Sequence, residues 1–585
     1  MSVSKITKSP GVGSIEAPGV SLATLTYGGP QDTASATEAF VIAPGMMEMP
    51  NNPFTVALDG QVPDTGTVTW LLNDVVQQTL PYDAAYTPTM MGKITAEFVL
   101  GGEAYVTVPL HIYMHDMSDP AMSPSHMVDE NAALGLVRQN VADFVAVQNG
   151  SWSDPATWSV GAVPGDGARV LIPSTRDVLY DSNTPVRLHS VRVDGLLDFA
   201  LDRSTSMLVE HLVETKTGTI RIAAKANRLP PQFTCQVTIS NRVFDSAPDA
   251  PSDLDFANDP RLIGRGVIWM GGGAIYGYHR APFAKTVALN LPMMGDTSVT
   301  LGADPEGWQV GDRILIPGTL FEEINGVTQR QDETRIITAI SGGVISFAEP
   351  LVYDHGWHNP ALAEQNIWRL KIVNMERNVT FRSEDGANLP AHQRGHTMVM
   401  HTNQTRHWDV AFLDMGRTDK SFVTGVINAN GDFEYPDPDS NAILTAPLTA
   451  QSNLQSRYPY HIHFPGFGKS VVAEAYYVYV EGVPGWGIVH HGGRANFVGC
   501  VAHRFLGAGM VSESANELGR WHDCVMVGCE STIADTQFPK GAEDKRGIQG
   551  DFAFSGYGFF YRGRDMVVTD CTAYGCTWAH VFYHR

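Results

Sequence analysis

The chain lacks several features that would assign it to a broad class. Its 585 residues contain no run that approaches the ~20 consecutive apolar residues of a membrane-spanning helix. The start, Met1-Ser2-Val3-Ser4-Lys5, lacks the apolar core of a secretory signal peptide. Basic residues are outnumbered, because 40 Lys and Arg face 62 Asp and Glu and give a net charge of −22. We therefore expect no membrane insertion and no general role on nucleic acid, and export by the general secretory route is unsupported.

Cysteine is scarce, and the 6 cysteines form no Cys-x-x-Cys pair of the kind that builds a zinc module. We interpret them as small buried residues, for which a disulfide is not required. Helical periodicity is also rare. Short runs rich in Val, Ile, Thr and Phe alternate with turn residues, and Gly 57 and Pro 35 supply many of those turns. This pattern predicts an all-β protein.

The N-terminal part divides into an arm, a module and a linker. Residues 1–35 are rich in Gly, Pro, Ser and Thr without periodicity, which is typical of an arm. Residues 36–115 hold short strands around a central Trp70 and predict an immunoglobulin-like β-sandwich that serves attachment or spacing. Residues 116–145 lose this alternation and predict a linker with one short helix near residues 130–138.

From about residue 146 the strands recur at regular intervals between glycines. Gly487-Ile-Val-His490 and Gly509-Met-Val-Ser512 lie 22 residues apart, and short runs that end in Cys recur in a similar way. Such a period predicts the stacked coils of a right-handed parallel β-helix, with residues 146–260 as a first β domain and 261–585 as the helix proper. The last residues still have coil-like sequence, so we expect the helix to continue past Arg585 or to be capped by another chain. A homo-oligomer or a larger assembly would supply such a cap.

The first coils resemble the eight-glycine domain of the cell-migration-inducing hyaluronidases, their transmembrane relatives and fibrocystin. The motifs that carry the resemblance are Trp152 with Trp158, Val163-Pro-Gly-Asp-Gly167, Val191-Arg-Val-Asp-Gly-Leu-Leu197, Gly271-Gly-Gly-Ala-Ile-Tyr-Gly277, Trp308-Gln-Val-Gly-Asp-Arg-Ile-Leu-Ile316 and Arg457-Tyr-Pro-Tyr-His-Ile-His463. They occur in the family's order over residues 145–530. The resemblance implies a β-helix and hyaluronidase-like cleavage of an acidic glycan. Ala508 or Gly509 and Ser514 stand where the family has His and Asp, which puts hydrolysis in doubt.

His461 and His463 form the centre of the candidate site. If residues 457–464 run as a strand, alternation places both imidazoles on one face. Two side chains follow at near-coil spacing, His490 after 27 residues, with the adjacent His491 as its alternative, and Glu513 23 residues after His490. We expect His461, His463, His490 and Glu513 to act as catalytic groups. Asp414, which could instead form a coil turn, and Glu481 are the further candidate acids.

The cofactor of this site is left open by the sequence. His461, His463 and His490 could hold a divalent metal, zinc or calcium, or the same histidines could work as acids and bases without one. A purely structural role is the alternative for these residues. The histidines could bond to backbone carbonyls, and Glu481 could begin the turn at Gly482.

A basic and aromatic group near the histidines suggests a sugar ligand. Arg457, Tyr458, Tyr460 and Trp486 are the candidate substrate-binding residues, because a guanidinium beside aromatic rings suits an anionic sugar. Aromatic ladders inside the coils are the alternative explanation for the three rings.

The sequence leaves two functions open. One is an enzyme, hydrolase or lyase, that cleaves an acidic polysaccharide. The other is a protein that binds a surface glycan without cutting it, such as a tail spike or fibre of a bacterial virus or a secreted adhesin. In both, the partner is a polysaccharide or cell-surface glycan, and the location is extracellular-facing or virion-associated.

Overall fold

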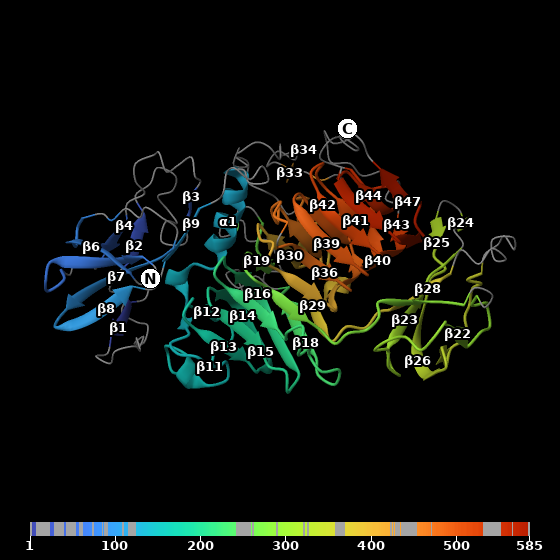
Figure 1. Ribbon diagram of the computed structural model, residues 1–585, viewed down its shortest axis with the longest axis horizontal. Coiled ribbons are helices and arrows are strands. Elements are labelled where there is room, and N and C mark those ends of the chain that lie inside the picture. The colour runs from blue at the N-terminus through green and yellow to red at the C-terminus, as the bar shows by residue number, and fades with distance from the viewer. Residues whose placement is uncertain are drawn as a thin grey trace.

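The computed structural model describes most of residues 62–582, and before residue 62 it describes short strands. The larger gaps within this range are 115–123, 242–258, 357–368, 435–452 and 531–551. Figure 1 shows a strand module at the N-terminal end, a long stack of strands in the middle and a smaller sheet at the far end. No helix among the described residues is long and apolar enough to cross a membrane.

The N-terminal module is built from a seven-stranded, mostly antiparallel sheet and a two-stranded sheet. Their strands are β1 (Val3–Ile6), β2 (Thr24–Tyr27), β3 (Phe40–Ile42), β4 (Phe54–Ala57), β5 (Thr67–Leu72), β6 (Val75–Pro81), β7 (Gly92–Leu100), β8 (Glu103–Thr107) and β9 (Leu110–Met114). Trp70 is buried and stacks on Tyr86 with ring centroids 5.1 Å apart. The expected arm contributes to this module, because β1 pairs with β8 and β2 pairs with β4.

The middle of the molecule is a parallel β-helix in which each coil crosses three faces, here called A, B and C. Face A is a ten-stranded parallel sheet of β11 (Gly150–Ser151), β13 (Asp177–Tyr180), β15 (Leu196–Phe199), β17 (Thr219–Ile222), β20 (Ala274–Tyr276), β31 (Arg406–Trp408), β36 (Ala473–Tyr476), β39 (Arg494–Val498), β42 (Leu518–His522) and β45 (Asp565–Thr569). Faces B and C together form one 18-stranded sheet, and the chain visits A, B and C in turn.

Face B holds β18 (Cys235–Ile239), β29 (Val379–Ser383), β32 (Val410–Leu413), β37 (Tyr479–Val483), β40 (Val501–Leu506), β43 (Val525–Glu530) and β46 (Thr572–Tyr574). Face C holds β10 (Phe144–Val145), β12 (Arg169–Ile172), β19 (Gly266–Trp269), β30 (His396–Met400), β35 (Tyr460–His463), β38 (Ile488–His491), β41 (Ala508–Ser512), β44 (Tyr557–Tyr561) and β47 (Trp578–Phe582). The long strands β14 (Asn183–Val193) and β16 (Thr205–Glu214) span both faces, since β16 pairs with β18 and then with β19.

The corner between faces A and B is a stack of residues in the left-handed conformation. They are Asp409, Tyr477, Gly499, Asp523 and Asp570, with φ between 54° and 60°. Asp tolerates this region better than most residues, because its short side chain bonds locally. Three cysteines directly follow such corner residues and are free thiols: Cys500 and Cys524, which are buried, and Cys571, which is partly buried.

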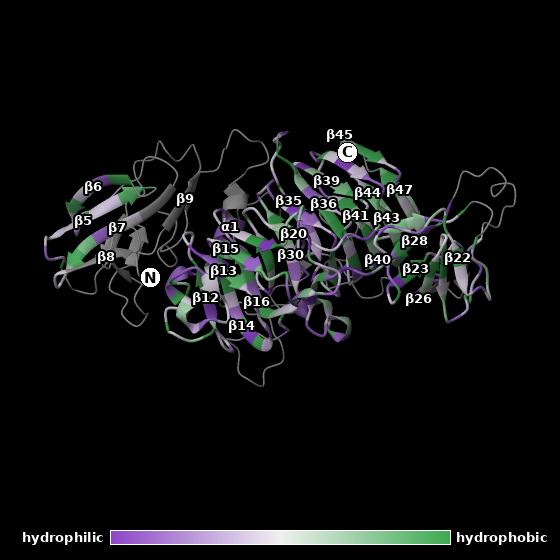
Figure 2. Ribbon diagram, turned by 60° about the horizontal axis from the view of Figure 1, so that its bottom comes forward, coloured by the Kyte–Doolittle hydropathy of each residue, from purple (hydrophilic) through white to green (hydrophobic). Residues whose placement is uncertain are grey.

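The interior of the coils is filled by the alternate side chains of all three faces. Trp269 is completely buried there and lies against His407, Phe381 and Phe412, with ring centroids 4.6 to 6.5 Å apart. Figure 2 shows the hydrophobic residues following the strands of the stack. Burial of these rings along the axis is the main source of stability of the fold.

One stretch departs from the expected continuous coils. Residues 283–374 form a separate six-stranded antiparallel sheet of β21 (Phe283–Lys285), β22 (Ser298–Thr300), β23 (Arg313–Ile316), β26 (Glu333–Ser341), β27 (Val344–Phe347) and β28 (Lys371–Asn374). Two hairpins lie outside the stack, β24 (Glu322–Ile324) with β25 (Val327–Gln329) and β33 (Val426–Ile427) with β34 (Phe433–Glu434). The inserted sheet replaces one A–B corner and packs on face B, where Ile314 and Leu315 share a core with Tyr479 and Val501. Short Gly-bounded strands suit hairpins as well as coils, so the sequence pattern alone does not separate them.

The linker helix covers part of face C. Helix α1 (Pro124–Leu136) and the residue that follows it place Ala133, Leu134 and Val137 against Met398 and Met400 of β30. The predicted linker therefore packs on the β-helix, and its polar residues reach the strands beside β30.

Candidate functional site

The histidine cluster lies on the outer side of face C, where three neighbouring strands are in register. His463 of β35 pairs with His491 of β38, whereas His490 pairs with the interior residue Ile462. His461 and His463 therefore share the outer side with His491, as alternation requires. His490 points into the coil, where its ring lies 5.4 Å from Phe497 and its Nε2 faces the Gly493 carbonyl at 3.2 Å. Of the two adjacent histidines that the sequence offers for this column, His491 joins it and His490 does not.

The nitrogen and oxygen atoms of this cluster lie close together. His463 Nδ1 is 3.0 Å from His491 Nδ1, and one Glu513 oxygen is 3.3 Å from that His491 nitrogen. The same Glu513 oxygen is 3.8 Å from His461 Nε2. His461, His463 and Glu513 are buried, while the His491 side chain is 18% exposed.

Burial controls the protonation of the cluster. It lowers the pKa of His461 well below its usual value and that of His491 to about 3, so both imidazoles are neutral at pH 7. It raises the pKa of Glu513 to about 7, although the charges of Lys420 and Arg562 oppose the increase.

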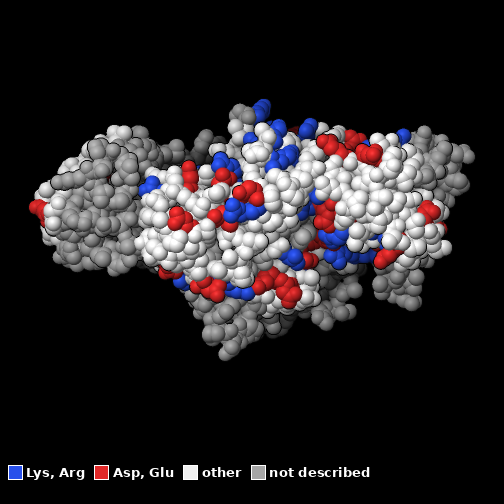
Figure 3. Space-filling model, turned by 90° about the horizontal axis from the view of Figure 1, so that it is seen from below, with Lys and Arg blue, Asp and Glu red and all other residues white. Residues whose placement is uncertain are grey.

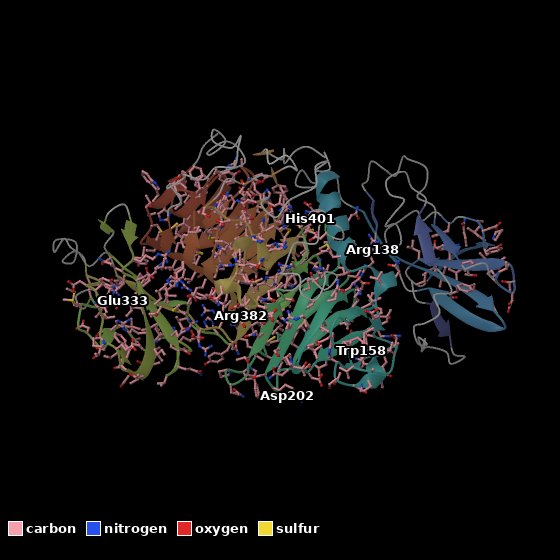
Figure 4. All side chains as sticks on the ribbon, turned by 180° about the vertical axis from the view of Figure 1, so that it is seen from behind. Arg138, Trp158, Asp202, Glu333, Arg382 and His401 are labelled. Atoms are coloured by element: carbon pink, nitrogen blue, oxygen red, sulfur yellow. The ribbon has the colours of Figure 1, made fainter. Side chains whose placement is uncertain are left out.

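Helix α1 contributes two acids beside the cluster. Asp129 lies 3.9 Å from His463, and Glu130 accepts a hydrogen bond from His401 at 2.7 Å and pairs with Lys216 at 2.9 Å. The rings of His401 and His463 are 5.3 Å apart. His401 is labelled in Figure 4, next to α1. These contacts explain why α1 is held over this part of face C.

A second group of residues lies where face B turns toward face C. Asp414, Gly482, Arg504 and Gly528 occupy equivalent positions on successive coils, all with positive φ, and two of them are ionisable. Gly482, which has no side chain, stands between Asp414 and Arg504, and this position is called the notch below. A Cβ at Gly482 would lie 2.4 Å from Asp414 Oδ1 and 3.6 Å from an Arg504 nitrogen.

Glu481 lies beside this notch and is held by several donors. Arg504 donates to one oxygen at 2.9 Å and Tyr479 donates to the other at 3.1 Å. His503 Nδ1 lies 3.5 Å from Glu481, and its Nε2 is bonded at 3.0 Å to Asp332, which precedes β26 in the inserted sheet. The inserted sheet therefore helps to fix the orientation of Glu481.

The pKa values of the two acids at the notch shift in opposite directions. Burial alone would raise the pKa of Glu481, but His503 and the charges of Arg504 and Arg313 outweigh it and hold the pKa at about 2. Burial raises the pKa of Asp414, and the negative charge of Glu481 raises it further. Pairs of carboxyls with separated pKa values are typical of acid–base sites.

Arginines surround the notch and remain open to solvent. The Arg382 side chain is 38% exposed and lies 3.9 Å from Asp414, and that of Arg504 is 50% exposed. Arg394 donates to the Gly482 carbonyl at 2.8 Å. Figure 3 shows Lys and Arg atoms gathered between acidic atoms near the middle of the lower face, and Figure 4 labels Arg382 between the inserted sheet and the first coils.

The predicted substrate-binding residues are buried. Arg457 donates to the backbone carbonyl of Leu262 at 2.6 Å, and Tyr460 lies inside the coil with its hydroxyl 3.1 Å from His407. Tyr458 and Trp486 stack on each other at 4.9 Å, and both are fully buried. None of the three rings presents a face to solvent, so their positions fit the alternative of core aromatic ladders.

Sequence reasoning missed the partners of Glu481. His503 follows Glu481 by 22 residues, one coil length, and that spacing was a usable signal. No sequence signal pointed to Asp332 or to the two acids of α1, because folding brings them to the coils from distant segments.

Comparison with known families places a G8 domain at residues 157–281. The predicted resemblance to the eight-glycine domain is therefore confirmed. In the structure this segment comprises most of the early coils and ends just before β21.

The curated relatives share about a fifth of their residues with this chain. Human fibrocystin-L is 22% identical over 43% of this chain and 6% of its own length. A G8 domain-containing protein of Dictyostelium discoideum is 21% identical over 54% of this chain and 19% of its own length. Protein rliB of the same organism is 20% identical over 62% of this chain and 29% of its own length. The chain thus spans less than a third of the length of these relatives.

Among solved structures, similarity is found to tailspikes of bacterial viruses. The gp49 tailspike of Pseudomonas phage LKA1 gives a TM-score of 0.15 and 10% identity, over 68% of this chain and 50% of its own. The Gp54 tailspike of Acinetobacter baumannii phage AP22, solved with capsular saccharide, gives a TM-score of 0.16 and 10% identity. The match covers 73% of this chain and 58% of the tailspike chain.

Proposed function

We propose that this protein binds an acidic polysaccharide at the notch between Asp414 and Arg504 and cleaves a glycosidic bond there. The observation that carries the proposal is the pair Asp414 and Glu481, two carboxyls on neighbouring coils whose pKa values are displaced in opposite directions. Glycoside hydrolysis uses such a pair, one acid that gives a proton and one carboxylate that stays ionised.

The charge around the notch supports an anionic substrate. Arg382 and Arg504 extend into solvent beside the two acids, and a guanidinium binds a carboxylate through two parallel hydrogen bonds. The chain as a whole is strongly acidic, so binding of an acidic polymer requires a local basic patch of this kind.

The two acids would divide the chemistry as follows. Protonated Asp414 donates its proton to the oxygen of the departing sugar. Ionised Glu481 stabilises the positive charge that develops at the anomeric carbon, and water adds to that carbon and returns a proton to Asp414. His503 and Arg504 keep Glu481 ionised, and the hydrogen bond from Tyr479 helps to orient its carboxylate.

This proposal moves the catalytic centre from the histidine cluster to the notch. The Asp414 side chain is 18% exposed and that of Glu481 is buried at 10%, and the exposed arginines beside them distinguish the notch from the histidine cluster. His461 is fully buried and Glu513 is 6% exposed. An extracellular or virion-associated setting, as the sequence predicts, is where such a polymer would be met.

We expect wild-type protein to shorten acidic polysaccharides and to leave neutral ones intact. Hyaluronan, alginate and polygalacturonate would be incubated with the protein beside dextran, and chain length would be followed by size-exclusion chromatography. Carboxyl-reduced samples of each acidic polymer should resist cleavage, because the arginines then lose their partner. Binding of an acidic polymer without any shortening would contradict the enzyme and support the adhesin or tail-spike alternative.

Gly482→Ala should abolish cleavage without unfolding the protein. The new Cβ would stand 2.4 Å from Asp414 Oδ1 and displace that carboxyl, while the positive φ of 72° costs ~1–2 kcal/mol. Gly528→Ala is the matched control. It carries the same strain at φ 70°, but its Cβ meets its nearest atom, on Asp332, at an ordinary 3.4 Å. Equal loss of activity in both variants would show that strain, and not the notch, is responsible.

A further inference from the structure

We propose that His461, His463 and His491, with Glu513, bind one zinc ion on the outer side of face C. The three histidines each offer a nitrogen, and these atoms all lie within 4.8 Å of one another. Zinc binds imidazole nitrogens at ~2.0–2.1 Å in tetrahedral geometry, so its ligands must converge to within a few ångströms. The closest pair, His463 Nδ1 and His491 Nδ1, is already 3.0 Å apart.

The backbone fixes the tautomer of His461 in the form that a metal requires. Its Nδ1 lies 3.3 Å from the Ser456 carbonyl oxygen, which can only accept, so Nδ1 carries the hydrogen. The lone pair of Nε2 then points toward Glu513. This Nε2 is fully buried and has no hydrogen-bond partner among the described residues. Metal-binding histidines commonly donate their other ring N–H to a backbone carbonyl in this way.

The fourth ligand would be the carboxylate of Glu513. Its Oε2 lies 3.3 Å from His491 Nδ1 and 3.8 Å from His461 Nε2, so one ion could contact all three residues. A donor set of three imidazoles and one carboxylate suits zinc and related transition metals. Calcium, the other metal considered from the sequence, prefers six to eight oxygens and does not fit. The His491 side chain, 18% exposed, is the most exposed of the four proposed ligands.

A second cluster, made of two histidines and one glutamate, shows what distinguishes this one. His189, Glu210 and His211 also bring their ligand atoms within 4.8 Å. However, the backbone N–H of Arg265 donates to His211 Nδ1 at 2.8 Å, so neutral His211 carries its hydrogen on Nε2, the atom that faces Glu210 at 3.6 Å. Hydrogen therefore occupies the position from which His211 would bind a metal, and this cluster carries no proposal.

The zinc site is tested by metal binding, which needs no catalytic assay. Protein dialysed against a chelator would be titrated with ZnCl2 by calorimetry, and with CoCl2 while the visible d–d absorption of tetrahedral cobalt is recorded. We expect one equivalent of each metal and an intense cobalt spectrum. His461→Gln, His463→Asn and His491→Asn should each weaken zinc binding at least 100-fold and weaken the cobalt spectrum.

Two variants separate loss of the zinc site from loss of the fold. His491→Asn changes the most exposed ligand and is expected to fold, which circular dichroism would verify. His522→Ala removes a half-exposed histidine of face A and should bind zinc as wild type does. Failure of wild-type protein to bind zinc, or unchanged binding in folded His491→Asn, would overturn the site. Cleavage at the notch does not depend on this outcome, because Asp414 and Glu481 are not among the ligands.

Discussion

Asp414→Asn should reduce the turnover number for an acidic polysaccharide by ~10²–10⁴-fold while the affinity for the polymer changes little. The amide keeps the size of the side chain and its place beside Gly482, but it cannot give a proton to the leaving sugar. Turnover and KM would be measured from new reducing ends. A comparable fall in binding affinity would instead assign Asp414 to substrate recognition.

The pH profile gives this prediction a second readout. Asp414 must be protonated to act, so turnover should fall as the pH rises through its pKa, which burial and Glu481 raise. Glu481 must be ionised, so turnover should fall on the acid side only near its pKa of about 2. Asp414→Asn should lose the alkaline limb of the profile.

Asp570→Asn is the matched control for this variant. Asp570 also has a positive φ, 58°, and its side chain is 63% exposed at the A–B corner. Asn accepts this backbone conformation as readily as Asp does, so turnover and its pH profile should remain those of wild type.

Trp269→Ala should lower the free energy of unfolding by ~3–5 kcal/mol, the usual cost of removing a buried aromatic ring. Trp269 is fully buried, and it lies against Phe381 of β29 on face B and His407 of β31 on face A, both in later coils. Its loss leaves a cavity that the flanking coils cannot close without breaking their strand pairing. Chemical denaturation followed by circular dichroism would measure the effect.

Trp578→Ala serves as the comparison for that experiment. Trp578 is 55% exposed in β47, the last described strand of face C. Its removal should change stability by less than ~0.5 kcal/mol. Equal effects of both substitutions would mean that the interior stack around Trp269 does not hold the coils together.

The fold was predictable because its signals are local and repeated. A 22-residue spacing with Gly-bounded strands indicated stacked coils, and alternation correctly placed His461 and His463 on the same side. Alternation fails one strand later because His490 and His491 are adjacent and either could face outward. Only the register, in which His463 pairs with His491, decides between them.

The notch was less predictable because its parts come from different segments. Asp414 and Glu481 were both considered as acids, but their partner Asp332 belongs to the inserted sheet, which the sequence suggested was more coil. The prediction that aromatic residues bind sugar fails for a related reason. Tyr458 and Trp486 are residue types that stack on sugar rings, yet both are completely buried. The sequence alone does not reveal which side of a strand another segment covers.

The continuity of the sheets across residue 281 has a consequence for how the G8 domain is defined. β16 pairs with both β18 and β19, which in turn pair with β29 and β30 beyond the family boundary. The domain is therefore a unit of sequence but not a unit of folding. A fragment cut at its boundary would end in a row of unsatisfied backbone N–H and C=O groups, a template for intermolecular strand pairing. Such a fragment should aggregate, whereas a cut between complete coils with an added polar cap should remain in solution.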